Sequence, residues 1–163
     1  MKADVQQTSL LIQNKRICHR FFEELLNKGR LSVIDELVDP NLLSHDPFPG
    51  QAPGSQGLKD TTKLFMKAFP DMRVIFKDTI AEGDKVMNRF TVKGTHKGNF
   101  MGIKPSGRKI AYEEIIILRL KDQKIVEHWA LADALTLMQQ IAPQAEKKKS
   151  GLSKAQSPEE TLH

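Results

Sequence analysis

The stretch KIAYEEIIILRLKDQKIVEHWALADALTLMQQI, which runs from Lys109 to Ile141, decides the fold of this chain. It predicts strands over residues 109–120 and 124–132, and the Asp122-Gln123 pair between them is typical of a tight reversal. The first of these strands is apolar on both faces, so both sides of its sheet need a cover. A short apolar helix is predicted to follow over residues 134–141.

Two further strands are predicted upstream of this stretch, over residues 73–81 and 86–95. The reversal at Glu82-Gly83-Asp84 joins them, so these neighbours run in opposite directions. The connection over residues 97–108 is longer and rich in glycine, which is typical of a loop at the rim of a fold. The four strands are therefore predicted to form an antiparallel meander.

Three helices are predicted before the sheet, over residues 8–28, 31–38 and 56–69, because apolar residues recur there at three- and four-residue steps. Residues 45–54, HDPFPGQAPG, contain three prolines and two glycines, which predicts an irregular loop. Helices followed by an antiparallel sheet are an α+β layout, in which the helices cover one face of the sheet. A homodimer packed sheet to sheet is the simplest cover for the other face.

The composition is that of an ordinary globular protein. The 163 residues suffice for one domain, expected over residues 1–142, followed by a polar tail over 143–163 that is expected to be disordered. The net charge of +5 comes from interleaved acids and bases, so no nucleic-acid partner is expected. The single cysteine, Cys18, excludes an internal disulfide. No apolar segment is long enough for a signal peptide or membrane span, so we expect a cytoplasmic location and no membrane partner.

Short motifs spread over residues 14–141 together resemble the SnoaL-like polyketide cyclase (ester cyclase) family. In chain order they are Asn14-Lys15, Asn27-Lys28-Gly29, His45-Asp46-Pro47, Phe69-Pro70-Asp71, Glu82-Gly83-Asp84-Lys85-Val86, Gly94-Thr95-His96, the loop from Gly98 to Gly107, and Lys124-Ile125-Val126-Glu127-His128-Trp129 with Asp133. The resemblance implies a cone-shaped α+β barrel like that of nuclear transport factor 2, with a pocket and usually a dimer. It also implies an intramolecular aldol reaction that closes a ring of a polyketide ester without metal or cofactor.

The last strand carries the candidate general base. Alternation places Trp129, Leu131 and Asp133 on one face, which we expect to line the pocket, with Trp129 as wall. His128 falls on the opposite face and is expected to face the helices or the dimer partner. A carboxylate in an apolar cavity has a raised pKa, which suits removal of a proton next to a carbonyl. The resemblance implies the acid/base role for Asp133, and the alternative is the N-cap of the final helix.

Two histidines are candidate assistants in catalysis. His45, in the proline-bound loop, is expected to donate a hydrogen bond to the substrate carbonyl. Its neighbour Asp46 is expected either to cap the loop beside the substrate or to form a turn that bonds its own backbone. His96 shares a face with Asn88 and Phe90, so these residues are expected in the pocket wall. The alternative for His96 is a bond to a loop carbonyl.

Glu114 is the second candidate carboxyl group. It lies mid-strand on the same face as Tyr112, where an isolated buried carboxylate is costly unless it is paired or functional. We therefore expect Glu114 and Tyr112 to contact the substrate. A salt bridge from Glu114 to Arg89 or Arg119 is the alternative.

The candidate residues point to acid/base chemistry. The histidines and Asp133 have no metal-ligand spacing, so neither a metal nor a cofactor is expected. The sequence therefore predicts a cofactor-independent enzyme that acts on an apolar carbonyl compound, by aldol cyclisation or isomerisation. The alternative is a non-catalytic dimer that binds an apolar small molecule in the same pocket.

Overall fold

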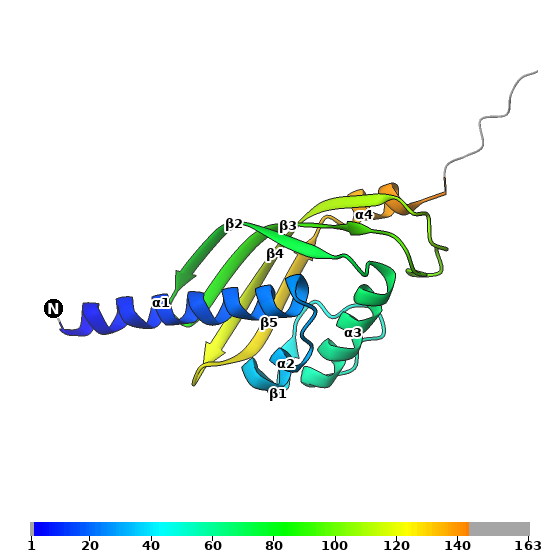
Figure 1. Ribbon diagram of the computed structural model, residues 1–163. Coiled ribbons are helices and arrows are strands. Elements are labelled where there is room, and N and C mark those ends of the chain that lie inside the picture. Colours follow the sequence, from blue (N-terminus) through cyan, green and yellow to red (C-terminus); the bar gives the residue numbers. More distant parts are fainter. Residues whose placement is uncertain (1, 144–163) are drawn as a thin grey trace, which may run out of the picture.

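A curved five-stranded sheet organises the protein (Figure 1). The computed structural model describes residues 2–143, so the tail expected over residues 143–163 lies outside the described residues from residue 144 onward. The strands follow the order β1-β5-β4-β3-β2, in which β1 runs parallel to β5 and the other neighbours are antiparallel. Their bounds are β1 Val38–Ser44, β2 Arg73–Glu82, β3 Lys85–Thr95, β4 Lys109–Lys121 and β5 Lys124–Ala132.

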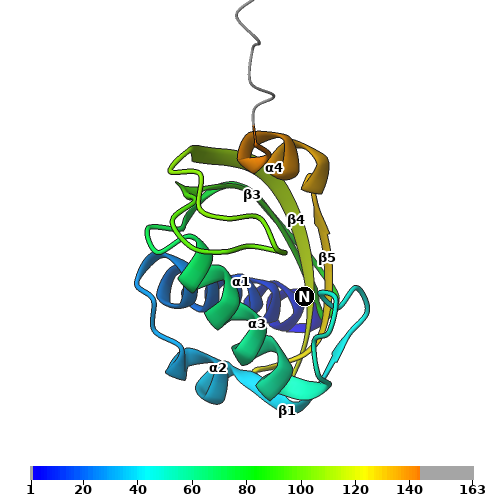
Figure 2. The same cartoon turned by 90° about the vertical axis from the view of Figure 1, so that its right-hand side faces the viewer.

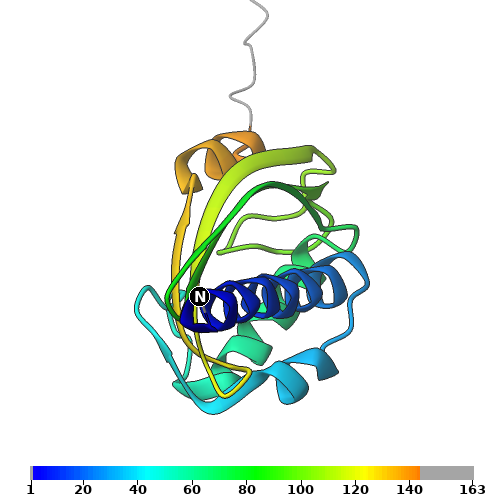
Figure 3. The same ribbon diagram turned by 90° about the vertical axis from the view of Figure 1, so that its left-hand side faces the viewer.

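Helices fill the inner side of this curve. The described helices are α1 Lys2–Phe22, which continues into a π-helical turn Glu23–Asn27, then α2 Ser32–Leu37, α3 Gly54–Ala68 and α4 Ala134–Ile141. The end-on views show the sheet wrapping around α1 and α3, with α4 closing one end (Figures 2 and 3). The α+β fold expected from the sequence is therefore confirmed.

The predicted meander is confirmed for β2 to β5. Gly83, Asp122 and Gln123 take positive φ values of 56°, 49° and 63°. Such left-handed residues give two-residue turns the twist that antiparallel hairpins need. The reversals at these positions therefore bring each strand back against its neighbour.

Strand β1 was not predicted. The sequence places a helix up to residue 38 and reads Pro40 as its end, but the chain continues as β1 from Val38. Proline lacks an N–H and is tolerated in a strand that lies at the edge of a sheet. β1 has β5 as its one neighbour, and its register shifts between Val38 and Leu43, around the proline.

The helix α1 begins earlier than its sequence signals indicate. The sequence places the start near Thr8, but the helix runs from Lys2. The Thr8 hydroxyl donates a 2.8 Å bond to the carbonyl of Asp4 inside the helix, so it does not cap a terminus. Residues 4–10 are exposed, and this end of α1 projects past the strands (Figure 1).

A one-residue bulge in β5 sets the faces of its side chains. Leu120 pairs with Ile125 and Arg119 with Glu127, so Val126 is the extra residue. An extra residue in a strand turns every later side chain to the opposite face. As a result Trp129 and Leu131 lie on the outer face of the sheet, and the expectation that Trp129 walls the pocket is wrong.

The core lies between α1 and the inner face of β2 and β3. Phe90 of β3 is fully buried there. Its ring meets the edges of Phe22 and Phe76, with centroid distances of 5.1 and 6.0 Å. Edge-to-face aromatic pairs of this kind add stability beyond the area that they bury.

We expect Phe90→Ala to lower the free energy of unfolding by about 3–5 kcal/mol, because it leaves a cavity in a closely packed aromatic cluster. The matched control is Leu64→Ala on α3, whose side chain is 57% exposed and whose change should stay within about 0.5 kcal/mol. Chemical denaturation of both variants measures the difference. Equal losses in the two variants would contradict this assignment of the core.

Candidate active site

A cavity of about 450 Å³ lies between the inner face of the sheet and the helices. Its walls are mostly apolar, with aromatic rings from α1, α3 and the loops. The loop between β1 and α3, residues 45–53, forms part of its rim and is named the mouth loop here. Four titratable side chains line the cavity within the described residues: Asp46, Tyr112, Glu114 and His128.

The floor of the cavity is made by β4 and β5. Glu114 pairs with Ala132, and His128 pairs with Leu118, so the two titratable groups are four residue steps apart along the strands. At the usual rise per residue this separation is roughly 13 Å. Ile116 and Ala130 lie between them, and Ala132 lies beside Glu114, so the floor has polar groups at its ends and apolar side chains in the middle.

Glu114 is a carboxyl group without a partner. It makes no hydrogen bond or ion pair within residues 2–143, and burial raises its pKa to about 7. The alternative of a salt bridge is wrong, because both arginines bind other carboxylates. Arg89 pairs with Asp78 and Glu113, and Arg119 pairs with Asp84 and Glu127. Glu114 therefore exchanges its proton near neutral pH.

Tyr112 lies two residues before Glu114 on the same face of β4, and both line the cavity. Burial and the neighbouring Glu114 carboxyl raise the pKa of Tyr112 well above its usual value. Its phenol therefore stays neutral and can donate a hydrogen bond. Both side chains line the cavity, and the expected contact of Tyr112 and Glu114 with a substrate stays a prediction.

His128 lines the opposite end of the floor. Its Nδ1 atom is buried and has no hydrogen-bond partner among the described residues. Burial lowers the pKa of His128 to about 4, while the Asp46 carboxylate acts in the opposite direction. The ring is therefore neutral at physiological pH. His128 was expected to face the helices or the dimer partner and was not proposed as a site residue, because the bulge that aligns it with Leu118 leaves no signal in the alternation of the sequence.

Asp46 lies at the cavity mouth. Its Oδ2 atom accepts a 3.3 Å bond from the N–H of Ala130 in β5. This contact is neither of the two expected roles, since the carboxylate reaches across to another strand and not to its own loop. It brings the charge of the mouth loop next to the floor of the cavity.

Asp133 lies outside the cavity. Its carboxylate accepts bonds from the N–H and the hydroxyl of Thr136, at 3.0 and 2.6 Å, and it is exposed. These bonds lower its pKa, which is opposite to what a base in an apolar cavity needs. The expected projection into the pocket is therefore wrong, and Asp133 is the N-cap of α4.

His45 also lies outside the cavity, on the outer face of the sheet. Its ring stacks on Trp129 with a centroid distance of 4.2 Å and an angle of 2°. Its Nε2 atom lies 2.8 Å from the Glu127 carboxylate. The expectation that His45 points into the pocket mouth is wrong, because the bulge at Val126 moved its partner Trp129 to the outer face.

His96, Asn88 and Phe90 are buried but do not line the cavity. Nδ1 of His96 accepts from the N–H of Ser106 at 3.3 Å, which fixes the base of the loop over residues 97–108. Asn88 accepts a 3.3 Å bond from the Thr79 hydroxyl. The alternation correctly predicts that these side chains point to the inner face of the sheet, but there they are buried in the core and not in the cavity wall. Neither the pocket contacts nor the alternative of a loop carbonyl for His96 is observed.

Within residues 2–143 no three His, Cys, Asp or Glu side chains are grouped so that they could hold a metal ion. No helix in that range is both long enough and apolar enough to cross a bilayer.

Comparisons with known proteins identify the family and agree with the fold. Residues 16–141 match the family described as SnoaL-like polyketide cyclase. Aklanonic acid methyl ester cyclase DnrD of Streptomyces peucetius is 25% identical over 124 residues, which are 72% of this chain and 83% of that protein. Aklanonic acid methyl ester cyclase DauD of Streptomyces sp. (strain C5) is 26% identical over 110 residues, and the match spans 66% of its length, just under two thirds. The solved structure of a putative polyketide cyclase from Bacillus cereus has 32% identity and a TM-score of 0.69, over 79% of this chain and 80% of that one.

We expect the stability of a Glu114→Gln variant to differ from the wild type in a pH-dependent way. The folded protein keeps the Glu114 proton up to about pH 7, whereas the unfolded chain releases it near about pH 4.3. The wild type therefore loses stability as the pH rises through this window, and the variant lacks this loss. The advantage of the variant should grow by roughly 3 kcal/mol between about pH 4 and pH 8.

Denaturation at a series of pH values measures this difference. Glu113→Gln is the matched control, because Glu113 is the adjacent carboxylate and pairs with Arg89 on the outer face. The control should show no comparable gain at high pH. A constant difference between wild type and Glu114→Gln would refute the raised pKa.

Proposed function

Because this chain belongs to the SnoaL-like polyketide cyclase family, we propose that it is an enzyme that performs acid/base chemistry on an apolar carbonyl compound. The reaction is an aldol cyclisation or an isomerisation and needs no cofactor. The observation that carries the proposal is Glu114, an unpaired carboxyl group in an apolar cavity. The proposal keeps the cytoplasmic location expected from the sequence.

Glu114 takes the role of general base. A base acts best when its pKa lies near the working pH, and burial brings the pKa of Glu114 to about 7. The carboxylate removes a proton from the carbon next to the substrate carbonyl, and the resulting acid returns it later. We assign this role to Glu114 and not to Asp133, because Asp133 is exposed outside the cavity.

Neutral donors stabilise the enolate that this step produces. The Tyr112 hydroxyl lies on the same face of β4 as the base and stays protonated, so it can donate to the developing oxygen charge. The neutral His128 ring binds a polar group at the other end of the floor. The apolar walls keep water away, which strengthens both contacts.

The second candidate function is binding without catalysis. It is favoured by one observation: the aspartate that the family resemblance marks as acid/base, Asp133, caps a helix in this chain. A binding protein needs the apolar cavity but no base. The experiment below distinguishes the two functions.

Incubation with aklanonic acid methyl ester, the compound in the names of the two relatives, tests catalysis. We expect the wild type to convert it, and Glu114→Gln to lower kcat by about 100-fold or more, since general base catalysis contributes that much. Asp133→Asn is the control and should keep kcat within about threefold, because it touches no cavity group. Unchanged turnover in Glu114→Gln would refute the assignment. Binding without product in the wild type would favour the second function.

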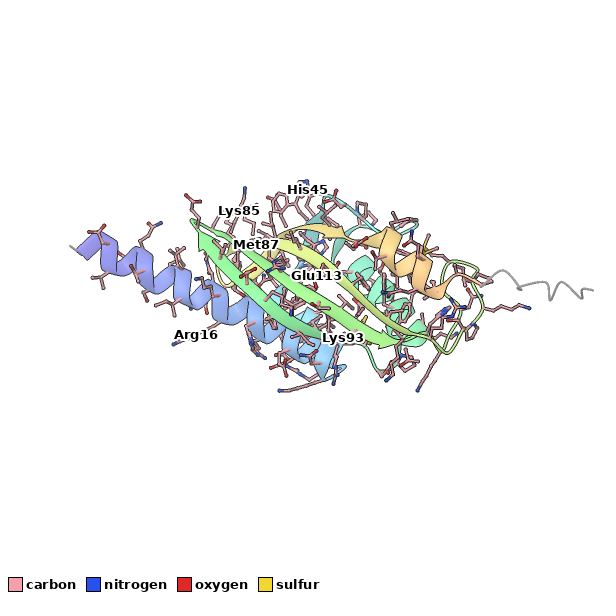
Figure 4. All side chains as sticks on the ribbon, turned by 90° about the horizontal axis from the view of Figure 1, so that it is seen from above. Arg16, His45, Lys85, Met87, Lys93 and Glu113 are labelled. Atoms are coloured by element: carbon pink, nitrogen blue, oxygen red, sulfur yellow. The ribbon has the colours of Figure 1, made fainter. Side chains whose placement is uncertain are left out.

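We also propose that the protein is a homodimer that packs through the outer face of the sheet. Ile80, Met87, Ile117 and Trp129 lie opposite one another in register and form an apolar row across four strands. Leu131 lies beside this row and is 73% exposed. Figure 4 looks onto this face, where Lys85, Met87 and Glu113 are labelled. An apolar surface of this kind is typical of a protein interface.

We expect Leu131→Asp to convert the dimer to a monomer, because it places a charge directly beside the apolar row. Light scattering coupled to size exclusion measures the mass. Leu64→Asp on α3 is the matched control, since Leu64 is exposed to a similar degree away from the sheet. A monomeric wild type, or a Leu131→Asp variant that stays dimeric, would contradict the interface.

A further inference from the structure

On the outer face of β5, the side chain of His45 is held by contacts with Trp129 and Glu127. The His45 ring stacks on Trp129, and its Nε2 atom binds the Glu127 carboxylate at 2.8 Å. Glu127 is itself held by Arg119. On the same ring of Trp129, the Lys85 ammonium lies 5.2 Å from the centroid. Figure 4 shows His45 at the edge of this face.

The next residue, Asp46, contacts β5 on the side of the cavity. The His45 N–H donates a 2.9 Å bond to the carbonyl of His128, so the chain runs alongside β5 at this point. One residue later, the Asp46 carboxylate accepts from the Ala130 N–H at 3.3 Å, at the cavity mouth. This second bond is long and exposed, and a bond of that kind is weak. The position of Asp46 therefore depends on the contacts that His45 makes with Trp129 and Glu127.

The cavity lining contains acidic side chains but no Lys or Arg among the described residues. Asp46 at the mouth and Glu114 inside are acidic, and no Lys or Arg is among the described residues that line the cavity. An anionic ligand group at the mouth would be repelled by Asp46, and no lining cation would compensate. A neutral group meets no such penalty.

We propose that His45 is a positioning residue: it fixes the Asp46 carboxylate at the cavity mouth, where Asp46 selects neutral ligands over anionic ones. The inference rests on the cavity as the ligand site of the proposed function. It does not depend on catalysis, so it can be tested by binding alone.

Two fluorescent dyes with the same skeleton provide the test. N-phenylnaphthylamine is neutral, and anilinonaphthalene sulfonate carries one negative charge. The measured quantity is the Kd of the anionic dye divided by the Kd of the neutral dye. We expect this ratio to fall about tenfold in Asp46→Asn, the size expected for two unit charges near a protein surface. His45→Ala keeps the charge of Asp46 but should lower the ratio by at least about threefold, because it frees the carboxylate.

His19→Ala is the matched control. His19 is also an exposed histidine stacked on an aromatic ring, that of Phe76 at 4.5 Å, but it touches neither the mouth loop nor β5. The ratio should stay at the wild-type value in this variant. A purely structural role of His45 would weaken the binding of both dyes equally and leave the ratio unchanged.

The outcomes separate the parts of the proposal. An unchanged ratio in Asp46→Asn overturns the selection by charge. An unchanged ratio in His45→Ala, with a lowered ratio in Asp46→Asn, overturns the positioning role. Failure of the wild type to bind the neutral dye overturns the cavity as ligand site, and the inference with it. A failed turnover test with intact dye selection affects the catalytic proposal alone.

Discussion

The pairing of β4 with β5 around Val126 determines which chemistry the cavity contains. In this pairing Leu120 lies opposite Ile125 while Arg119 lies opposite Glu127, and the residue left over is Val126. A regular hairpin would turn Trp129 inward, beside Ile116. The bulge turns His128, Ala130 and Ala132 inward in its place. One unpaired residue thereby exchanges a bulky indole for a neutral imidazole and two small methyl groups.

Neighbouring residues on β4 show how strongly the two faces differ. Glu113 points outward, binds Arg89 and the Thr91 hydroxyl, and belongs to a surface network of charges. Glu114 points inward and has no partner among the described residues, so its pKa rises to about 7. The side-chain type is the same in both cases. The raised pKa of Glu114 comes from its burial, which is a simple way to obtain a base from a carboxyl group.

Periodicity in the sequence was sufficient for the helices, for β2 to β5 and for the inward face of β4, because these depend on local patterns of apolar residues. It failed at β1, where Pro40 masks an edge strand, and at β5, where a bulge cannot be read from alternation. Tyr112 and Glu114 were therefore placed on the correct face, and His128 faces the helices, which was one of its two expected positions, whereas Trp129 was placed on the wrong face. Asp133 follows the end of β5, where capping of α4 decides its direction.

The alanines of the floor have a consequence for the shape of the ligand. Ala130 and Ala132 contribute a single methyl group each to the β5 side of the floor, opposite Ile116 and Glu114 of β4. A flat part of a ligand can lie against these two methyl groups, with the Ile116 side chain beside it. Because these two side chains face the cavity, larger residues there would reduce the cavity volume without disturbing the packing of the helices on the sheet. The volume of the cavity above β5 can therefore change through these two residues while the fold stays the same.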